Sequence, residues 1–434
     1  MTSVLARRRF ITLSALRQLP TGLVLPVLVL LPIARDISPA SIGMLFGAYS
    51  AATILFELPT GGLADVIGAR PVLLIATAFA VGATLIVATS QTLPSMLAGY
   101  TLFGVSRALD SGPLQSWYVN HERAHDQHAP VRTGLSRASA CASIAIALGA
   151  LATAAITHVG GSTPRSGTLI PVALPPLAAA AMYALYGVLV ARWLVPVTDA
   201  PRARLGDAMV DVPRTLRNGF SLARQRGPLR RLLLLTAAIG AALAGIELLA
   251  PLHLSELTAD TNSTATFFAL LTCAAFLVAG VGAWASPLLA HWFRSAPVTL
   301  AATTIIAAIA LAGVGLPGVL AAGGMYLIFY ATLGAGEPLL DELTHDAVGA
   351  GHRTTVLSIR SMTLQSVGML TSVSVGWLAD RAGTPPAFLA VSVVMACGSV
   401  ALFGWKRRGY TTADATRTTE AHGYASTAGS SSGT

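Results

Sequence analysis

The sequence predicts an all-α membrane protein with twelve transmembrane helices in two six-helix bundles. Three observations favour this class: the composition, a series of long apolar runs, and a basic segment that divides the series in two. The 434 residues are 54% hydrophobic and 11% charged, with a mean hydropathy of +0.67. A water-soluble domain has about 25% charged residues, so the chain is predicted to lie in a lipid bilayer.

The apolar runs give the helices in order. A hydrocarbon core roughly 30 Å thick requires about 20 apolar residues in a helix, and runs of this length recur between short loops rich in Gly, Pro and polar residues. The runs are continuous and rich in Ala and Leu, whereas the strands of a membrane barrel are short and alternate in polarity. The predicted spans cover residues 10–33, 41–63, 71–89, 95–118, 137–158, 169–194, 232–255, 265–290, 297–316, 319–342, 356–378 and 386–405.

The loops between these spans give the expected orientation. Basic residues gather before the first span, after the sixth and after the last, whereas loops such as "TSQTLPS" and "SELTADTNST" are neutral or acidic. Basic loops stay on the cytoplasmic side of a membrane, so both termini are predicted to be cytoplasmic. The net charge of +9 is therefore a topology signal, and nucleic acid is not an expected partner.

The basic segment has six predicted spans on each side, which is where a duplicated chain would be joined. We predict a first bundle over residues 1–195, a cytoplasmic linker over 196–231 and a second bundle over 232–408. The tail at 409–434 is rich in Thr, Ser, Gly and Ala and is predicted to be disordered. A repeat supports the duplication, because "VRTGLSRAS" after the fourth span corresponds to "HRTTVLSIRS" after the tenth.

The loop after the second span carries a motif. Residues 57–70 read "ELPTGGLADVIGAR", in which the glycines allow a tight turn and close helix approach and the aspartate can meet a helix N-terminus or an arginine. The stretch resembles the loop motif of the major facilitator superfamily, Gly-x-x-x-Asp-(Arg/Lys)-x-Gly-(Arg/Lys)-(Arg/Lys). Two basic positions of that motif are missing here. The matching positions, which we expect to act in gating, are Gly61, Asp65, Gly68 and Arg70.

The resemblance covers about residues 10–405 and includes Arg107 and Gly112 in the fourth span. It implies a secondary transporter whose two bundles enclose a shared cavity. The phrase "ELPTG" resembles a bacterial branch associated with efflux of drugs and small metabolites. The antiporter signature of the fifth helix is not intact, because "ALGALATAAITHVGG" lacks a Gly-Pro pair. Export and import therefore both stay open by motif.

Ionisable residues within the predicted spans are candidates for function, because they are costly in a bilayer and are usually paired or functional. One interpretation is a cytoplasmic ion-pair network that opens and closes during transport. Another is that one carboxylate carries the proton that drives transport. The expected members of the charge network are Arg17, Arg107, Arg360 and Asp341. The proton-coupling candidates, in order of preference, are Asp110, Glu57, Glu337 and Glu247.

Residue counting places these candidates along the membrane. At about 1.5 Å per residue, Glu247 falls in the outward half without an arginine at similar depth, whereas the other coupling candidates fall in the cytoplasmic half. Arg107 and Asp110 are three residues apart and share a helix face. His253 lies near the outer end of the seventh span and is expected at the membrane interface rather than in a proton relay.

The expected function follows from these features. No Gly-x-x-x-x-Gly-Lys-(Ser/Thr) phosphate loop occurs in the sequence, so we expect the proton-motive force rather than ATP as the energy source, with no cofactor and no metal site. We predict a monomeric transporter of the bacterial inner membrane that works by alternating access. Its expected activity is proton-coupled efflux, as an antiporter, of a hydrophobic or cationic small molecule such as a drug or secondary metabolite.

Two other functions are alternatives to proton-coupled efflux. The first is a proton-coupled uptake permease for a sugar, an amino acid or a carboxylate. The second is a membrane sensor or an enzyme with a membrane-embedded site. No His-rich or Ser/His/Asp constellation supports the last of these, and no enzymatic activity is expected.

Overall fold

The computed structural model describes residues 3–60, 63–125, 131–160, 170–194, 227–258, 260–293, 295–347 and 353–402. All regular structure within these ranges is helical. Most of the predicted linker and the whole predicted tail at 409–434 lie outside them. The helix that follows the linker begins at Gly227, so the last residues assigned to the linker are helical.

The first half contains six spans, several of which are interrupted. The first span combines α1 with the short η1 and α2, and the sixth combines η2 with α9. In order the elements are α1 (Ser3–Val24), η1 (Leu25–Val27), α2 (Leu30–Ile33), α3 (Pro39–Thr60), α4 (Leu63–Ile67), α5 (Ala69–Thr89), α6 (Leu93–Asp110), α7 (Pro113–His125), α8 (Arg132–Gly160), η2 (Pro171–Ala173) and α9 (Leu174–Trp193).

The second half contains six longer and simpler helices. They are α11 (Gly227–Leu257), α12 (Thr261–Trp292), α13 (Ala296–Val314), α14 (Val319–Asp346), α15 (Arg353–Ala382) and α16 (Thr384–Val400). Tight turns between helices use glycine where the backbone needs a positive φ, as at Gly68 (92°), Gly318 (112°) and Gly383 (85°). Each of these three glycines directly precedes a helix.

The fourth span differs from its expected form. A single helix was predicted over 95–118, but α6 ends at Asp110 and α7 begins at Pro113. Gly112 has φ 116°, a conformation that breaks a right-handed helix and that other residues rarely adopt. The corresponding span of the second half, α14, continues without interruption past Glu337.

Nine helical segments among the described residues are long and apolar enough to cross a membrane on their own. The other three spans are α6, α15 and α16. The helix α16 is apolar but has 17 residues, whereas α6 and α15 carry charged and polar side chains such as Arg107 and Gln365. Spans with polar residues occur in membrane proteins where the polar side faces a cavity or another helix.

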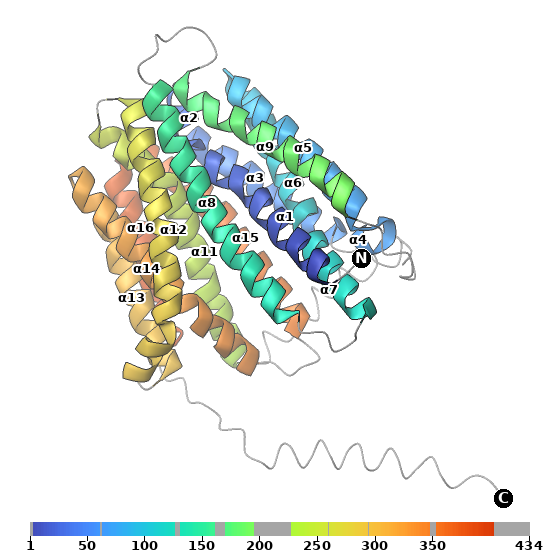
Figure 1. Cartoon of the computed structure of the whole chain (residues 1–434). Helices are drawn as coiled ribbons and strands as arrows, with labels where there is room; N and C mark the ends of the chain where they lie inside the picture. The colour runs from blue at the N-terminus through green and yellow to red at the C-terminus, as the bar shows by residue number, and fades with distance from the viewer. Residues whose placement is uncertain are drawn as a thin grey trace, which may run out of the picture. The chain divides into compact units, whose positions relative to one another are not determined.

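The helices pack in the same pattern in both halves. In the first half α1 packs on α8 and α9, α6 packs on α3 and α5, and α5 packs on α9. In the second half α11 packs on α15 and α16, α14 packs on α12 and α13, and α13 packs on α16. Each pair of the first half thus has its counterpart in the second. Figure 1 shows the first half in blue to green and the second in yellow to red.

Glycine allows corresponding helices to approach closely. A Cβ atom on Gly22 of α1 would lie 2.1 Å from the carbonyl oxygen of Ile146 on α8. A Cβ atom on Gly240 of α11 would lie 2.6 Å from the carbonyl oxygen of Leu364 on α15. Small residues permit such contacts between membrane helices. Both halves therefore use glycine where their first and fifth spans cross.

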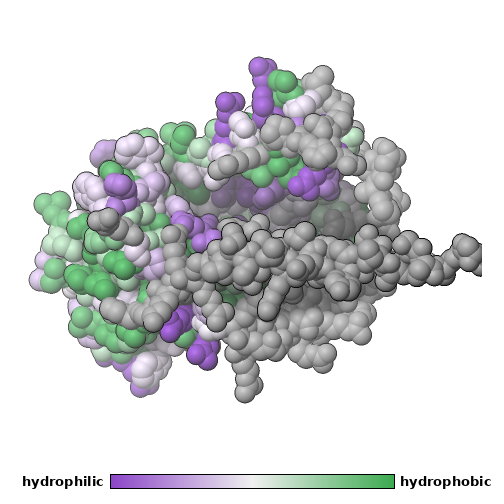
Figure 2. All heavy atoms as spheres, turned by 90° about the horizontal axis from the view of Figure 1, so that it is seen from below, coloured by the Kyte–Doolittle hydropathy of each residue, from purple (hydrophilic) through white to green (hydrophobic). Residues whose placement is uncertain are grey.

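The two halves meet along α3 with α15 and along α8 with α12. They pack closely at the end away from the N-terminus, where a Cβ on Gly43 would lie 2.5 Å from the carbonyl oxygen of Ser372. At the same end the hydroxyls of Thr157 and Thr266 are 2.9 Å apart. Figure 2 shows the molecule from below, with many hydrophobic side chains over the flank on the left and hydrophilic ones toward the middle and the top of the view.

Candidate functional site

A cavity of about 350 Å³ lies between the two halves. Five helices of the first half line it, namely α1, α3, α5, α6 and α9, together with η1. From the described part of the second half, α11 and α15 line it. Pockets of this size, between helices and with a few polar groups, commonly bind small molecules.

The first half provides an aromatic wall to the cavity. Ring centroids of Tyr49 and Phe103 are 5.9 Å apart, and those of Phe103 and Tyr183 are 6.5 Å apart. Such separations are typical of aromatic pairs that stabilise each other edge to face or offset. We name as the aromatic wall the residues Phe46, Tyr49, Tyr100, Phe103, Tyr183 and Tyr186.

The second half lines the cavity without aromatic side chains among the described residues. Here α11 and α15 are closely packed through Gly240, and Gly368 lies beside them with Ala244 as a neighbour. We name Gly240, Ala244 and Gly368 the small-residue face. The larger polar side chains on this side of the cavity are Gln365 and Glu247.

Two predicted residues form an ion pair at the cavity. The Nη1 atom of Arg17 lies 2.8 Å from Oδ2 of Asp110 and 3.0 Å from its carbonyl oxygen. Their side chains are 23% and 19% exposed. The other carboxylate oxygen, Oδ1, is buried and has no hydrogen-bond partner among the described residues. The first-ranked coupling candidate is therefore held against a member of the predicted charge network.

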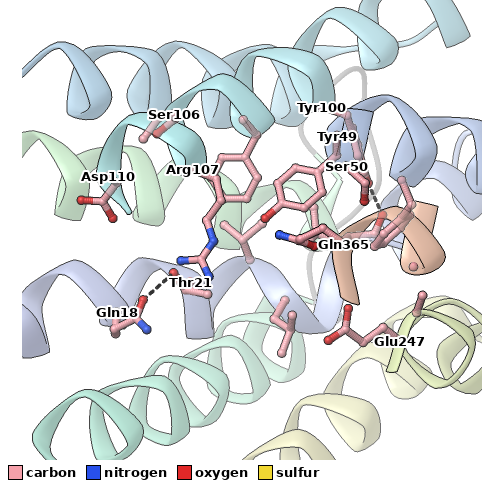
Figure 3. A pocket seen from close by; sticks show the side chains of 18 of the residues that line it. Gln18, Thr21, Tyr49, Ser50, Tyr100, Ser106, Arg107, Asp110, Glu247 and Gln365 are labelled. Atoms are coloured by element: carbon pink, nitrogen blue, oxygen red, sulfur yellow. Dashed lines mark hydrogen bonds between the residues drawn. The ribbon is translucent and has the colours of Figure 1, made fainter. Parts of the chain in front are cut away.

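Arg107 and Glu247 reach the cavity from opposite halves (Figure 3). Arg107 is exposed to the cavity and lies near the hydroxyl of Tyr49, and its charge acts on Glu247. The expectation that Glu247 lacks an arginine at similar depth was thus wrong, because counting residues along each helix ignored the length of the arginine side chain. Among the described residues, no ion pair within 4.0 Å joins the two halves.

The remaining charged candidates lie away from the cavity lining. Glu57 is partly buried near the end of α3, and Arg107 is the cation that acts on it. Glu337 is exposed on α14, one helical turn before Asp341, which pairs with Arg360 of α15. The expected charge network is therefore divided, in the described ranges, into separate pairs within each half.

The loop motif is described only in part. Gly61 lies outside the described residues, and Asp65 belongs to α4 without a described side chain. Gly68 precedes α5 with its positive φ, and Arg70 is partly buried in the first turn of that helix. The gating role of these four residues stays a prediction.

Several cavity residues were not singled out from the sequence. Gln18 and Thr21 on α1 are three residues apart, as are Tyr183 and Tyr186 on α9, and Gln365 comes from α15. Residues at this spacing share a helix face, so polar or tyrosine pairs within an apolar run were the available signal. The sequence does not determine which face of each helix points into the cavity.

A second polar cluster lies outside the cavity, at the end of α11. His253 lies near the end of this helix and is 4% exposed, and its expected position at the membrane interface stays a prediction. Its Nδ1 lies 2.7 Å from Oγ1 of Thr384 on α16, and its Nε2 lies 3.1 Å from the carbonyl oxygen of Leu316 after α13. Glu256 accepts a hydrogen bond from Thr384 at 2.6 Å. Buried polar groups in such clusters hold neighbouring elements in register.

Comparison with known proteins identifies the family to which this architecture belongs. The sequence matches the Major Facilitator Superfamily over residues 10–372. The chain belongs to this superfamily. It is a multi-pass membrane transporter, and its twelve spans in two bundles are those of the superfamily fold. No curated protein matches the sequence at a significant level.

Solved transporter structures share the fold at low sequence identity. The nucleoside transporter NupG has a TM-score of 0.71 with 13% identity, covering 92% of this chain and 100% of that one. A peptide transporter in complex with sulfate has a TM-score of 0.72 with 12% identity, covering 92% and 93%. The human organic anion transporter MFSD10 has a TM-score of 0.60 with 16% identity, covering 93% and 100%. These similarities concern the fold and do not select a substrate.

Proposed function

We propose that this transporter of the superfamily couples proton movement to the export of a small organic molecule that carries a cationic group. The observation that supports this proposal is the position of Glu247. It is the cavity carboxylate that has no salt bridge within the described residues, whereas Asp110 is held by Arg17. A proton and a substrate cation can therefore compete for the Glu247 carboxylate, which is the requirement for antiport.

The cycle follows from this competition. A protonated Glu247 is neutral and does not hold a cation, whereas an ionised Glu247 attracts one across a cavity largely removed from water. Loss of the proton thus favours substrate binding, and protonation from the opposite side releases the substrate. The proton gradient supplies the energy, and the proposed cycle requires no cofactor and no ATP.

The direction of export rests on the proposed orientation. With both termini in the cytoplasm of a bacterium and the chain in its inner membrane, the tight seam at Gly43 and Ser372 lies on the outer side. The cavity then belongs to a state that is closed to the outside and able to receive substrate from the cytoplasm. A single chain contains both halves of the cavity, so we propose a monomer as the working unit.

Transport across proteoliposomes tests the proposal. A pH gradient should drive accumulation of lipophilic organic cations by the wild type, whereas Glu247→Gln, which mimics the neutral protonated state, should bind these cations weakly and show no uphill accumulation. Asp380→Asn, which changes an exposed carboxylate at the end of α15, is the matched control. Full coupling in Glu247→Gln, or loss of coupling in Asp110→Asn alone, would contradict the role given to Glu247.

An uptake permease is the second candidate. The cavity faces of α1 and α6 are more polar than expected from the sequence, with Gln18, Thr21 and Ser106 in addition to the charged residues. Polar groups of this kind suit a hydrophilic solute. Vesicles of known orientation separate the two functions, because export moves substrate against the proton flux and uptake moves it with the flux.

A further inference from the structure

The charges that line the cavity are balanced but unevenly placed. Arg17 and Asp110 neutralise each other at 2.8 Å within the first half. This leaves Arg107 on the first half and Glu247 on the second. The cavity therefore has a positive group on one side and a negative group on the other, with a net charge close to zero when Glu247 is ionised.

These two groups line the same cavity, where one ligand can reach both. No ion pair within 4.0 Å joins them in the ranges that the structure describes. In Figure 3 the neutral side chain of Gln365 lies between them. Charged groups in a partly dehydrated site are costly unless they find partners of opposite charge. A molecule with one acidic and one basic group satisfies both.

A ligand of a single charge fits this pattern less well. A simple cation can pair with Glu247, but it enters a cavity in which Arg107 has no salt bridge among the described residues and repels it. A simple anion has the opposite difficulty at Glu247. Electrostatic complementarity selects between such partners more than it adds to total affinity.

The walls of the cavity add a requirement on shape. The aromatic wall comes from the first half, and the small-residue face comes from the second. Gly240 packs directly against the backbone of Leu364, so α11 and α15 meet closely beside the small-residue face. Flat rings stack well against aromatic side chains, and the small-residue face, with Leu243 and Leu364 beside it, offers an apolar surface to their other side.

We propose that the transported molecule is a flat aromatic zwitterion. Its ring lies between the aromatic wall and the small-residue face, its acidic group meets Arg107 and its basic group meets Glu247. This inference rests on the proposed function only in taking the cavity as the substrate site, and it narrows the cationic substrate to one with an acidic group as well.

Four related probes test the charges and the ring separately. The zwitterion is para-aminomethylbenzoate, its methyl ester is a cation, and its N-acetyl derivative is an anion. Tranexamic acid has the same two charged groups on a saturated ring. Equilibrium binding to purified protein without a pH gradient should be about tenfold weaker for each derivative that lacks one charge, as expected for loss of a hydrogen bond to a charged group.

Variants assign each end of the probe. In Arg107→Gln the zwitterion should bind no better than the ester, and in Glu247→Gln no better than the N-acetyl derivative. The inference is overturned if the ester binds as tightly as the zwitterion in the wild type, if tranexamic acid matches the aromatic probe, or if none of the four binds. Proton-driven movement of lipophilic cations would in those cases still support the proposed function, so the two failures are distinguishable.

A glycine substitution tests the small-residue face. A Cβ on Gly368 would have its nearest neighbours, on Ala244 and Gly240 of α11, at 3.6 Å, so Gly368→Ala fits the helix packing and adds a methyl group within the small-residue face. We expect it to weaken binding of the thicker tranexamic acid several-fold more than that of the flat probe. Gly324→Ala on α14, where no atom lies within 4 Å of the added Cβ, is the control. Equal weakening of both ligands would contradict the proposed placement of the ring.

Discussion

The ion pair of Arg17 and Asp110 joins α1 to α6 beside the cavity. Because Oδ1 of Asp110 already lacks a partner in the described part of the chain, this carboxylate depends on Arg17 for its charge compensation. Removing one member of a buried pair is more costly than replacing both, since the remaining charge is left uncompensated.

A double-mutant cycle measures this dependence. We expect Arg17→Gln alone to destabilise the protein by about 3 kcal/mol, and the double variant Arg17→Gln with Asp110→Asn to recover much of that loss. Thermal unfolding in detergent gives the order of stabilities. If the double variant is less stable than Arg17→Gln, the two residues do not act as a pair.

His253 is a residue whose contacts reach two other elements. Replacement by leucine leaves the carbonyl oxygen of Leu316 without this partner, whereas the hydroxyl of Thr384 keeps its hydrogen bond to Glu256. Each buried polar group that loses its partner costs about 1–3 kcal/mol, so His253→Leu should unfold at a clearly lower temperature. The exposed His291 at the end of α12 gives the matched variant His291→Leu, for which we expect little change.

At the scale of the element, close helix packing depends on single glycines. In Gly22→Ala the new methyl group would meet the backbone of α8 at 2.1 Å, so α1 and α8 must move apart and the yield of folded protein should fall. In Gly324→Ala the methyl group meets nothing within 4 Å, and helix propensity favours alanine by roughly 0.5–1 kcal/mol. Size-exclusion profiles and thermal unfolding compare the two. If both variants behave alike, the protein tolerates a larger distance between α1 and α8.

The helices themselves follow from the sequence, because long apolar runs and glycine-rich or proline-rich turns are local features. The interruption at Gly112 was missed, although Gly112 directly precedes Pro113 and such a pair marks turns. The cavity was predicted less well. The residues Arg17, Arg107, Asp110 and Glu247 were singled out as charges inside spans, but the aromatic wall was not, because an aromatic residue in an apolar run does not show which neighbour it faces.

The contacts of the carboxylates give a different order of proton-coupling candidates from the one that the sequence predicts. Asp110 ranked first from sequence and Glu247 last, yet Asp110 has an arginine at 2.8 Å while Glu247 faces the cavity. Depth along a helix can be counted from the sequence. Direction around the helix, and the partner found there, depend on the packing of segments far apart in the chain.

At the scale of the whole molecule, transport by alternating access requires the seam between the halves to open. The hydroxyls of Thr157 and Thr266 are 2.9 Å apart across this seam. In a background without the three native cysteines, Thr157→Cys with Thr266→Cys should form a disulfide under oxidation and stop transport. A reductant should restore it, and each single variant should transport normally. Undiminished transport by the oxidised double variant would mean that the seam does not open there.

The helix pairing repeats between the halves, whereas the side chains that line the cavity do not. A chain built from two copies of the second half would retain the helix crossings and glycine contacts within each half, but not the contacts that Gly43 and Thr157 make across the seam. Its central space would have two glutamates, without the aromatic wall or the guanidinium of Arg107. The helix packing is therefore repeated in both halves, whereas the binding properties of the cavity require the different side chains of the two halves.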